Sequence, residues 1–292
     1  MRKFTQVFIL LMAAVSAKAQ EFKILSTISV ETDYEYGGVK GFNITYKYNF
    51  LSLEEFAHND TLLRGCEFKL TTQLLANNEK VKPAQGYKSV TNSSGVLEYT
   101  IKLKGREIQP SYFDKKVTQF IPYAALNLTE GENTVTVQAE MSGKDADGHL
   151  HQHKKEKKDI SFKKPPTKLF TLNIDYIEVN PHNAKGHVWD YAMFNSDAPD
   201  VGVNVLVGNT SVFRSNVNDS HMFAAGPNSK NISFMISAKD KISVLIQDID
   251  VLFHDLIAKW EIATRYKKDG QVYTYDNTNA NIKSCSVNYK IN

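Results

Sequence analysis

The chain has 292 residues, with 35 lysines and arginines against 32 aspartates and glutamates and a formal net charge of +3. A charge so close to balance argues against a nucleic-acid-binding protein, and no arginine-rich or aromatic-interleaved stretch argues for one. The two cysteines, Cys66 and Cys285, are too few for a disulfide framework, so we expect two separate thiols rather than a bridge between them.

The N-terminus has the order of a cleavable secretory signal. Two basic residues precede an apolar run at 7–15, and the small residues Ala17 and Ala19 follow on either side of Lys18. The apolar run is about half of the roughly 20 residues that span a bilayer, which disfavours a membrane anchor. We therefore expect that residues 1–19 are a signal peptide cleaved before Gln20, and that the mature protein is secreted or periplasmic.

Most of the remaining chain alternates apolar and polar residues and is rich in Val, Ile, Thr, Tyr and Phe, which predicts β-strands. In chain order we expect strands at 42–50, 66–75, 96–103, 118–123, 134–141, 170–179, 201–207, 232–236 and 242–249. Clusters of Gly, Asn, Asp and Pro separate these segments, as turns do. Only 255–264 is compatible with a short helix, and it fits a strand nearly as well. The pattern predicts an all-β protein made of two β-sandwiches.

The composition changes between 143 and 168, where glycine, histidine and lysine gather and Pro165-Pro166 ends the stretch. A Pro-Pro pair cannot join the centre of a sheet and stiffens the chain, so this stretch predicts a linker. We expect an N-terminal β-sandwich at 20–147, a basic linker at 148–168 and a second domain at 169–292. On the strand and bend pattern of 120–137, the first domain is weakly similar to immunoglobulin-like domains of secreted bacterial proteins.

Two stretches of the second domain, at 189–205 and 246–257, place acidic residues beside a strong strand. Calcium requires 6 to 8 oxygen ligands, so carboxylates from two loops must converge to bind it. Two residues of a strand that are separated by one other residue face the same side, as do the aspartates of Asp-x-Asp at 248–250. The metal-ligand candidates are Asp190, Asp200, Asp248, Asp250 and Asp255, with Asp197 as a competitor of Asp190. Clustered carboxylates repel one another unless a cation joins them. The alternative is that these aspartates are ordinary turn formers.

The residues of these stretches also resemble a known family. The segment Asp-Val-Gly-Val-Asn-Val at 200–205 resembles the strand that follows the first calcium loop of C2 domains, and Asp-x-Asp-x₄-Asp at 248–255 resembles their third calcium loop. The resemblance covers about 169–292 and implies a C2-like sandwich in which the five aspartates bind Ca²⁺. Three departures are Val201-Gly202 in place of the usual Pro-Tyr, the absence of the usual glycine after the final loop, where Ala258 stands, and the long spacing from Asp190 to Asp200.

Apolar residues stand beside the acidic ones, at Met193-Phe194 in the first loop and at Leu252-Phe253 in the third. If they are exposed, they form a membrane-contacting or partner-contacting edge. If they pack against each other, they only close the loops. Members of the C2 family bind phospholipid headgroups through calcium or bind proteins, so the resemblance implies phospholipid headgroups or a protein partner here.

No sequence motif indicates catalysis: the chain has no Gly-x-Ser-x-Gly, no His-Glu-x-x-His and no phosphate-binding glycine loop. The histidines at 149–153 have metal-ligand spacing, but their polar surroundings favour a solvated loop. We therefore expect a non-enzymatic exported protein that attaches to a membrane surface or partner through calcium. The alternatives are a hydrolase with a C2-like accessory domain and an ion-free structural envelope or adhesion protein.

Overall fold

The computed structural model describes residues 23–24, 27–49, 67–88, 97–104, 115–144, 150–189, 198–218, 220–224, 231–249, 254–264, 267–274 and 279–292. Across these residues the chain is almost entirely β-structure, and the named helical element is one 3₁₀ turn, η5 (Tyr123–Ala125). Within the same ranges, no helix has the length and apolar character needed to cross a membrane. The prediction of an all-β sandwich architecture is confirmed.

The N-terminal half forms two antiparallel sheets. Its strands are β1 (Lys23–Ile24), β2 (Ser29–Tyr36), β3 (Val39–Asn49), β4 (Glu67–Ala76), β5 (Glu79–Lys80), β6 (Glu98–Lys104), β7 (Lys115–Pro122), β8 (Gly131–Lys144) and β9 (Leu150–Lys164). Strands β1, β2 and β7 pair with β3 in the sheet that we call sheet A. Strands β5, β6 and β8 pair with β4, and β9 pairs with β8, in sheet B.

The inward faces of sheets A and B enclose one hydrophobic core. Alternate residues of β3, namely Phe42, Ile44 and Tyr46, are buried against residues of β4 and β8, as the two-residue period of a half-buried strand requires. Tyr46 and Thr72 join the two sheets by a hydrogen bond of 2.6 Å between their hydroxyl oxygens. Burial raises the pKa of Tyr46 to about 12, so its hydroxyl stays neutral at every physiological pH.

The C-terminal half forms a second pair of antiparallel sheets. Its strands are β10 (Thr167–Val179), β11 (Val201–Val207), β12 (Thr210–Val217), β13 (Met222–Ala224), β14 (Ile232–Ser237), β15 (Ile242–Ile249), β16 (His254–Ile262), β17 (Val272–Thr274) and β18 (Ile282–Ile291). Sheet C has the order β13-β10-β18-β17, with β14 also on β10, and sheet D has the order β12-β11-β15-β16. The ambiguous segment at 255–264 lies almost wholly in strand β16, and its Trp260 is buried in the core.

The stretch expected as a basic linker is mostly a strand, so the linker prediction is wrong for 150–164. Strand β9 pairs with β8 from Lys144↔Leu150 to Gly131↔Lys164. Ile160 and Phe162 of β9 point into the core, while its lysines lie along the edge of sheet B. Charged side chains, lysine above all, are a common protection of an exposed sheet edge. The lysine-rich composition therefore marks an edge strand here.

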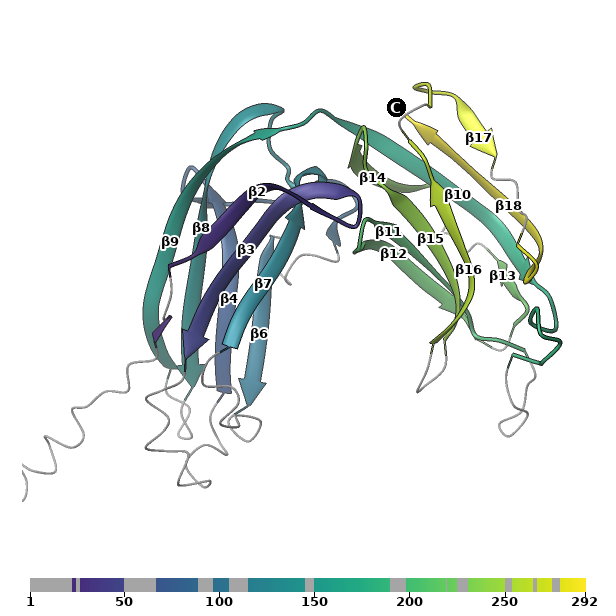
Figure 1. Ribbon diagram of the computed structural model, residues 1–292, viewed down its shortest axis with the longest axis horizontal. Helices are drawn as coiled ribbons and strands as arrows, with labels where there is room; N and C mark the ends of the chain where they lie inside the picture. Colours follow the sequence, from purple (N-terminus) through teal and green to yellow (C-terminus); the bar gives the residue numbers. More distant parts are fainter. Residues whose placement is uncertain are drawn as a thin grey trace, which may run out of the picture.

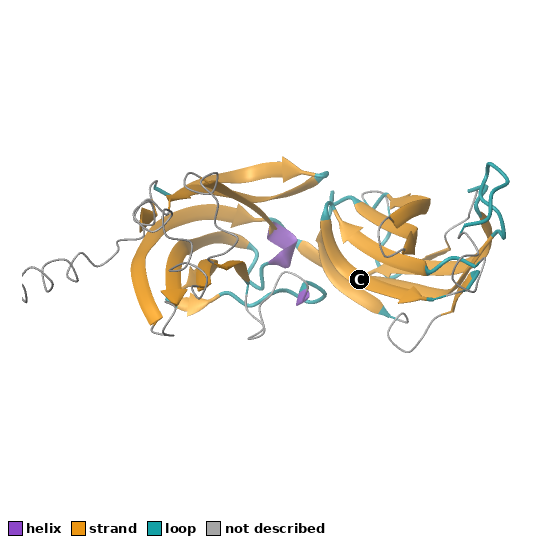
Figure 2. Cartoon of the chain, turned by 90° about the horizontal axis from the view of Figure 1, so that it is seen from below, coloured by secondary structure: helices purple, strands orange, loops and turns teal. Residues whose placement is uncertain are grey.

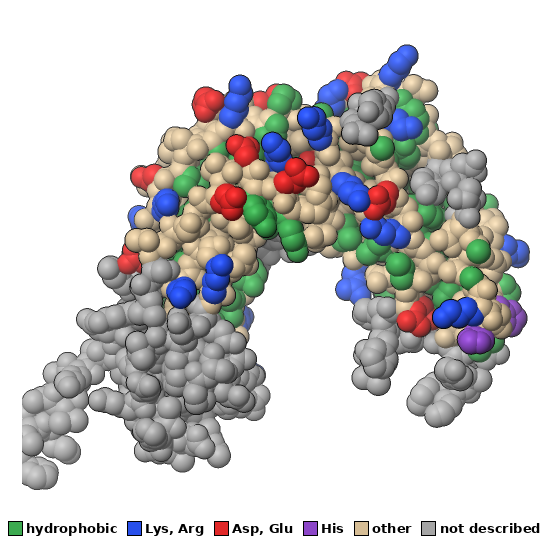
Figure 3. All heavy atoms as spheres, viewed as in Figure 1, with side chains coloured by type: hydrophobic (Ala, Val, Ile, Leu, Met, Phe, Trp, Pro, Cys, Tyr) green, Lys and Arg blue, Asp and Glu red, His purple; other side chains and the backbone are tan. Residues whose placement is uncertain are grey.

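Only Pro165-Pro166 separates β9 from β10, so the chain passes directly from the edge of sheet B into the middle of sheet C. In Figure 1 this continuous path crosses the top of an arch whose two legs are the two sandwiches. Turned by 90°, the molecule shows the sandwiches side by side with η5 at their junction (Figure 2). On the face drawn in Figure 3, acidic and basic side chains are intermingled over the arch.

Candidate functional site

The predicted calcium site lies at one end of sheet D, and the structure describes part of it. Three of the five candidate ligands, Asp200, Asp248 and Asp255, are in described segments. The other predicted site residues fall outside them: Asp190, Asp250, Met193, Phe194, Leu252 and Phe253. Ligand and contact roles for those six therefore stay predictions.

The three described aspartates are neighbours. Asp200 immediately precedes β11, and its backbone N–H donates a hydrogen bond of 2.9 Å to Oδ1 of Asp248 in the adjacent strand β15. Asp248 is in turn the register partner of Asp255 in β16. The backbone N–H of Ile249 in turn donates a hydrogen bond of 3.0 Å to the backbone carbonyl of Asp200. Two loops that are about 45 residues apart in sequence thus bring their acidic residues to the same end of one sheet.

Their environments differ. Asp248 is completely buried, with 0% exposure, whereas Asp200 is half-buried and Asp255 is exposed. A buried carboxylate requires hydrogen-bond donors, and the Asp200 N–H supplies one; the same bond is typical of a structural turn-forming aspartate. Within the described segments, no three His, Cys, Asp or Glu side chains make a group able to hold a metal ion. A calcium site here would therefore also need Asp190 and Asp250, which lie outside the described residues.

Gly202, part of the Val201-Gly202 departure from the C2 pattern, packs closely against the neighbouring strand. A Cβ at this position would lie 2.0 Å from Cδ1 of Ile249 on the neighbouring strand. A larger residue at 202 would force the Ile249 side chain to shift. Glycine at this position therefore suits the local packing beside Asp248.

A second feature, which the sequence did not predict, is the seam between the two sandwiches. Val39, Ala84, Tyr87, Ala124 and Ala125 of the N-terminal half belong to the same buried cluster as the C-terminal core. They come from the β2–β3 hairpin, the segment 81–88 and η5. The N-terminal half therefore contributes to the core of the C-terminal sandwich, while its own core is a separate cluster.

Hydrogen bonds and close backbone packing reinforce the seam. Met235 N–H in β14 donates to the carbonyl of Gln85 at 3.1 Å, and the Tyr87 hydroxyl donates to the carbonyl of Met235 at 3.0 Å. Gly86, between the two, has φ of +87°, and a Cβ on it would lie 2.2 Å from Cβ of Phe234. Glycine is required here both for the backbone conformation and for the close approach of the segment 85–87 to strand β14.

The seam also buries a titratable group. Asp240, in the turn between β14 and β15, accepts a hydrogen bond of 2.7 Å at Oδ2 from the Ser237 N–H, and Thr264 donates to its backbone carbonyl at 3.3 Å. Burial raises the pKa of its carboxyl group to about 7. Burial, together with the nearby Asp240, raises the pKa of Tyr87 well above its ordinary value. At neutral pH the seam therefore holds a carboxyl group poised between its two protonation states.

Comparison with known proteins identifies no family. No family model matches the chain, and no curated protein matches it. Among solved structures, the chain is similar to one described as a biofilm-associated protein, BSP domain, at 11% identity and a TM-score of 0.27. The match covers 87% of this chain and 54% of that one, so the chain spans about half its length. At that TM-score the likeness carries no functional argument.

Proposed function

We propose that this chain is an exported, non-catalytic structural or adhesion protein whose two β-sandwiches act as one rigid arch. The observation that carries the proposal is the seam. Domains joined by a short linker move relative to each other by default, unless their interface is large and hydrophobic. Here five residues of the N-terminal half are buried in the C-terminal core, a backbone hydrogen bond crosses from Met235 to Gln85, and the Tyr87 hydroxyl adds a second.

Rigidity has a functional meaning for such a protein. A locked seam fixes the distance and direction between the far ends of the two sandwiches, so that a surface on one is presented at a constant position relative to the other. The direct passage of β9 into β10 through Pro165-Pro166 supports the same role, since proline restricts backbone rotation at the junction. The predicted signal peptide would place this arch outside the cytoplasm.

The test compares Tyr87→Ala with Tyr99→Ala, a substitution of an exposed tyrosine in the same sandwich. We expect the wild type and Tyr99→Ala to unfold in one cooperative transition and to give the small-angle scattering curve of one rigid body. Tyr87→Ala should unfold in two transitions and scatter as a flexible pair. Cells that export Tyr87→Ala should also attach to surfaces less well than cells that export Tyr99→Ala. Two transitions in the wild type, or equal attachment by both variants, would contradict the proposal.

A second candidate function is calcium-dependent attachment through the end of sheet D. The convergence of Asp200, Asp248 and Asp255 at the same end of sheet D supports it. In this function the aspartates would hold Ca²⁺, and the bound ion would supply the attraction for phospholipid headgroups or for carboxylates of a protein partner. Extracellular calcium is plentiful, so a site with a dissociation constant of about 10⁻⁴ to 10⁻³ M would be constitutively filled.

The experiment is calorimetric titration of Ca²⁺ into the chelator-treated full chain, followed by thermal melts with and without the ion. We expect saturable heat and a raised melting temperature for the wild type and for Asp175→Asn, a control on sheet C. The double variant Asp248→Asn, Asp250→Asn should lose both effects. If the wild type gives no heat and no shift, the aspartates are structural and only the first proposal remains.

A further inference from the structure

The turn that carries Asp240 touches the N-terminal half on both sides. Before the turn, the backbone N–H of Met235 donates its hydrogen bond to the carbonyl of Gln85. After the turn, Lys241 lies against the β2–β3 hairpin, since a Cβ on Gly38 would lie 3.0 Å from Cβ of Lys241. Asp240, which is 5% exposed, is therefore buried where the two halves meet.

A second turn of the C-terminal sandwich, between β11 and β12, is bonded to the first and also contacts the hairpin. The backbone N–H of Gly208 donates a hydrogen bond of 2.8 Å to the carbonyl of Lys241. A Cβ on Gly208 would lie 2.8 Å from Cγ2 of Val39, and a Cβ on Gly37 would lie 3.1 Å from the side chain of Asn209. The hairpin therefore rests on both turns, and a shift of either turn reaches it.

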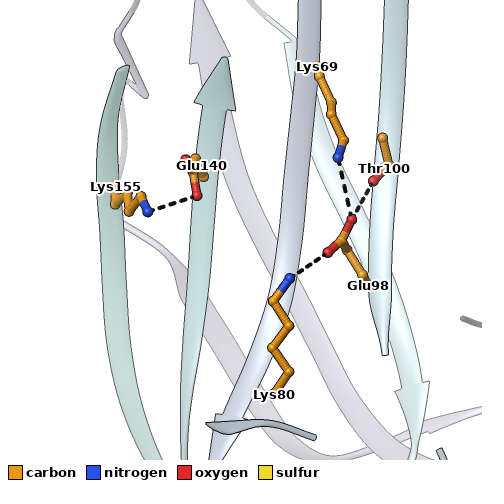
Figure 4. Close-up of polar contacts among 6 residues, drawn as sticks. All are labelled: Lys69, Lys80, Glu98, Thr100, Glu140 and Lys155. Carbon is orange, nitrogen blue, oxygen red and sulfur yellow. Dashed lines mark hydrogen bonds and ion pairs between the residues drawn. The ribbon is translucent and has the colours of Figure 1, made fainter. Parts of the chain in front are cut away.

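The surroundings of Asp240 differ from those of another carboxylate that is equally buried. The Glu98 side chain in sheet B is 5% exposed, and it lies beside the ammonium groups of Lys80 at 3.1 Å and Lys69 at 3.6 Å (Figure 4). Among the described residues, the Asp240 carboxylate accepts one hydrogen bond, of 2.7 Å, from the Ser237 N–H. Burial without a cation favours the neutral form of a carboxyl group. The closed seam therefore suits neutral Asp240.

The charged and titratable groups around Asp240 give it no ion pair within the described residues. Lys241 pairs with Glu261 of β16 at 2.9 Å, and Lys239 is exposed. Tyr87, which faces Asp240 from the N-terminal half, stays neutral because burial, with a contribution from Asp240, raises its pKa. Ionisation of Asp240 therefore places an unbalanced charge at the seam.

The described histidines of the C-terminal sandwich lie at its other end. Asp240 adjoins the end where β10 begins, since Thr167 pairs with Ser237. The histidines stand where β10 and β15 end, and they are His182, His187, His221 and His254. Arg265, which follows the Asp240-bonded Thr264, lies outside the described residues. A pH effect at the seam near neutrality therefore points to Asp240.

We propose that the seam is a pH-dependent switch, which is closed while Asp240 is neutral and opens when Asp240 ionises. The inference rests on the rigid arch proposed above. A buried carboxylate that has no cation beside it must gain water. Moving the hairpin and the segment 84–87 away from the two turns admits water and leaves the paired sheets of both sandwiches intact. Openings of this kind, which are smaller than global unfolding, are common in native proteins.

The direction of the switch follows from proton binding. Burial raises the pKa of the Asp240 carboxyl group from 3.8 to about 7 in the closed seam, and hydration returns it to its ordinary value in the open one. Opening then releases a proton between pH about 4 and pH about 7, so the equilibrium constant for opening should rise about tenfold per pH unit in that range. Above pH about 7 both states are ionised and the constant levels off.

The test is amide hydrogen exchange of the full chain, followed by NMR from pH about 5 to pH about 8. The Met235 amide reports the seam, since its hydrogen bond crosses to Gln85, and the Val244 amide in the middle of sheet D reports unfolding of the whole sandwich. After correction for intrinsic exchange, the protection of Met235 should fall about tenfold per pH unit up to pH about 7. It should not respond to low urea, because seam opening exposes little surface, whereas Val244 should be better protected and respond strongly.

Asp240→Asn should remove the pH dependence of Met235 protection, and Asp175→Asn, which removes an exposed carboxylate from the same sandwich, should keep it. The wild-type profile decides if Asp240→Asn folds poorly. If Met235 and Val244 share one protection and one urea dependence, or if Met235 protection is constant with pH, the switch is overturned and the rigid arch stands. An unchanged slope in Asp240→Asn would also overturn it. A Met235 amide that is unprotected at pH about 5 would contradict the arch itself.

Discussion

Asp240 makes the stability of this protein depend on pH, and Asp240→Asn should remove that dependence. The residue is 5% exposed and burial raises the pKa of its carboxyl group from 3.8 to about 7. Asparagine keeps a carbonyl oxygen to accept the Ser237 N–H but carries no charge. Of the neighbouring groups, Tyr87 has a raised pKa and stays neutral, and Lys241 is ion-paired with Glu261 at 2.9 Å.

The sign follows from proton binding. Between pH about 4 and pH about 7, Asp240 holds a proton in the folded protein and releases it on unfolding, so the unfolded state binds fewer protons and stability falls as pH rises. The shift of about three pKa units corresponds to about 4 kcal/mol in the free energy of unfolding, at about 1.4 kcal/mol per unit. The loss is complete above pH about 7 and absent below the unfolded pKa of about 4.

The assay is urea denaturation of the wild type and Asp240→Asn across this pH range. The difference in unfolding free energy, variant minus wild type, should grow by about 4 kcal/mol from pH about 4 to pH about 8. The subtraction removes the opposite contributions of Glu178 and Glu261, whose pKa values are lowered by hydrogen bonds from lysines and, for Glu178, from Ser284. A difference that stays constant with pH would refute the reasoning.

Three further substitutions test the packing, each by urea denaturation. Gly86→Ala should destabilise by about 3 kcal/mol, because its positive φ and the β14 backbone leave no room for a Cβ; a loss under about 1 kcal/mol would contradict the seam geometry. Tyr87→Phe should cost about 1 kcal/mol through the lost hydrogen bond to Met235, and an unchanged midpoint would count against that bond. Phe162→Ala should cost about 3 to 5 kcal/mol, while Lys157→Ala on the same strand should change stability by less than about 0.5 kcal/mol.

The strands that the sequence predicts correctly are those with clear alternation. All nine predicted segments coincide with strands, because residues such as Val203 and Val205 in β11 or Val135 and Val137 in β8 repeat with the period of a half-buried strand. Strand β18 was missed because its inward residues, Ile282, Val287, Tyr289 and Ile291, are interrupted by a bulge and by polar residues.

The proximity of two of the predicted calcium ligands also follows from the two-residue period of the strands. Asp200 and Asp248 were expected to meet, and the structure joins them by a hydrogen bond, because both stand at ends of strands that pair directly. Whether they bind calcium does not follow from strand pairing. That question depends on Asp190 and Asp250, and on how many oxygens reach one point.

The seam shows why the rest was beyond the sequence. Gly86 has φ of +87°, a conformation that glycine adopts without strain. The same missing Cβ also admits Phe234, almost 150 residues away, and nothing near either residue encodes that contact. Val39, Ala84 and Ala125 likewise look like residues of one sandwich, yet they are buried in the core of the other. An interface built from single residues of several turns has no period, so only the paired sheets, once placed in space, reveal where the two sandwiches are in contact.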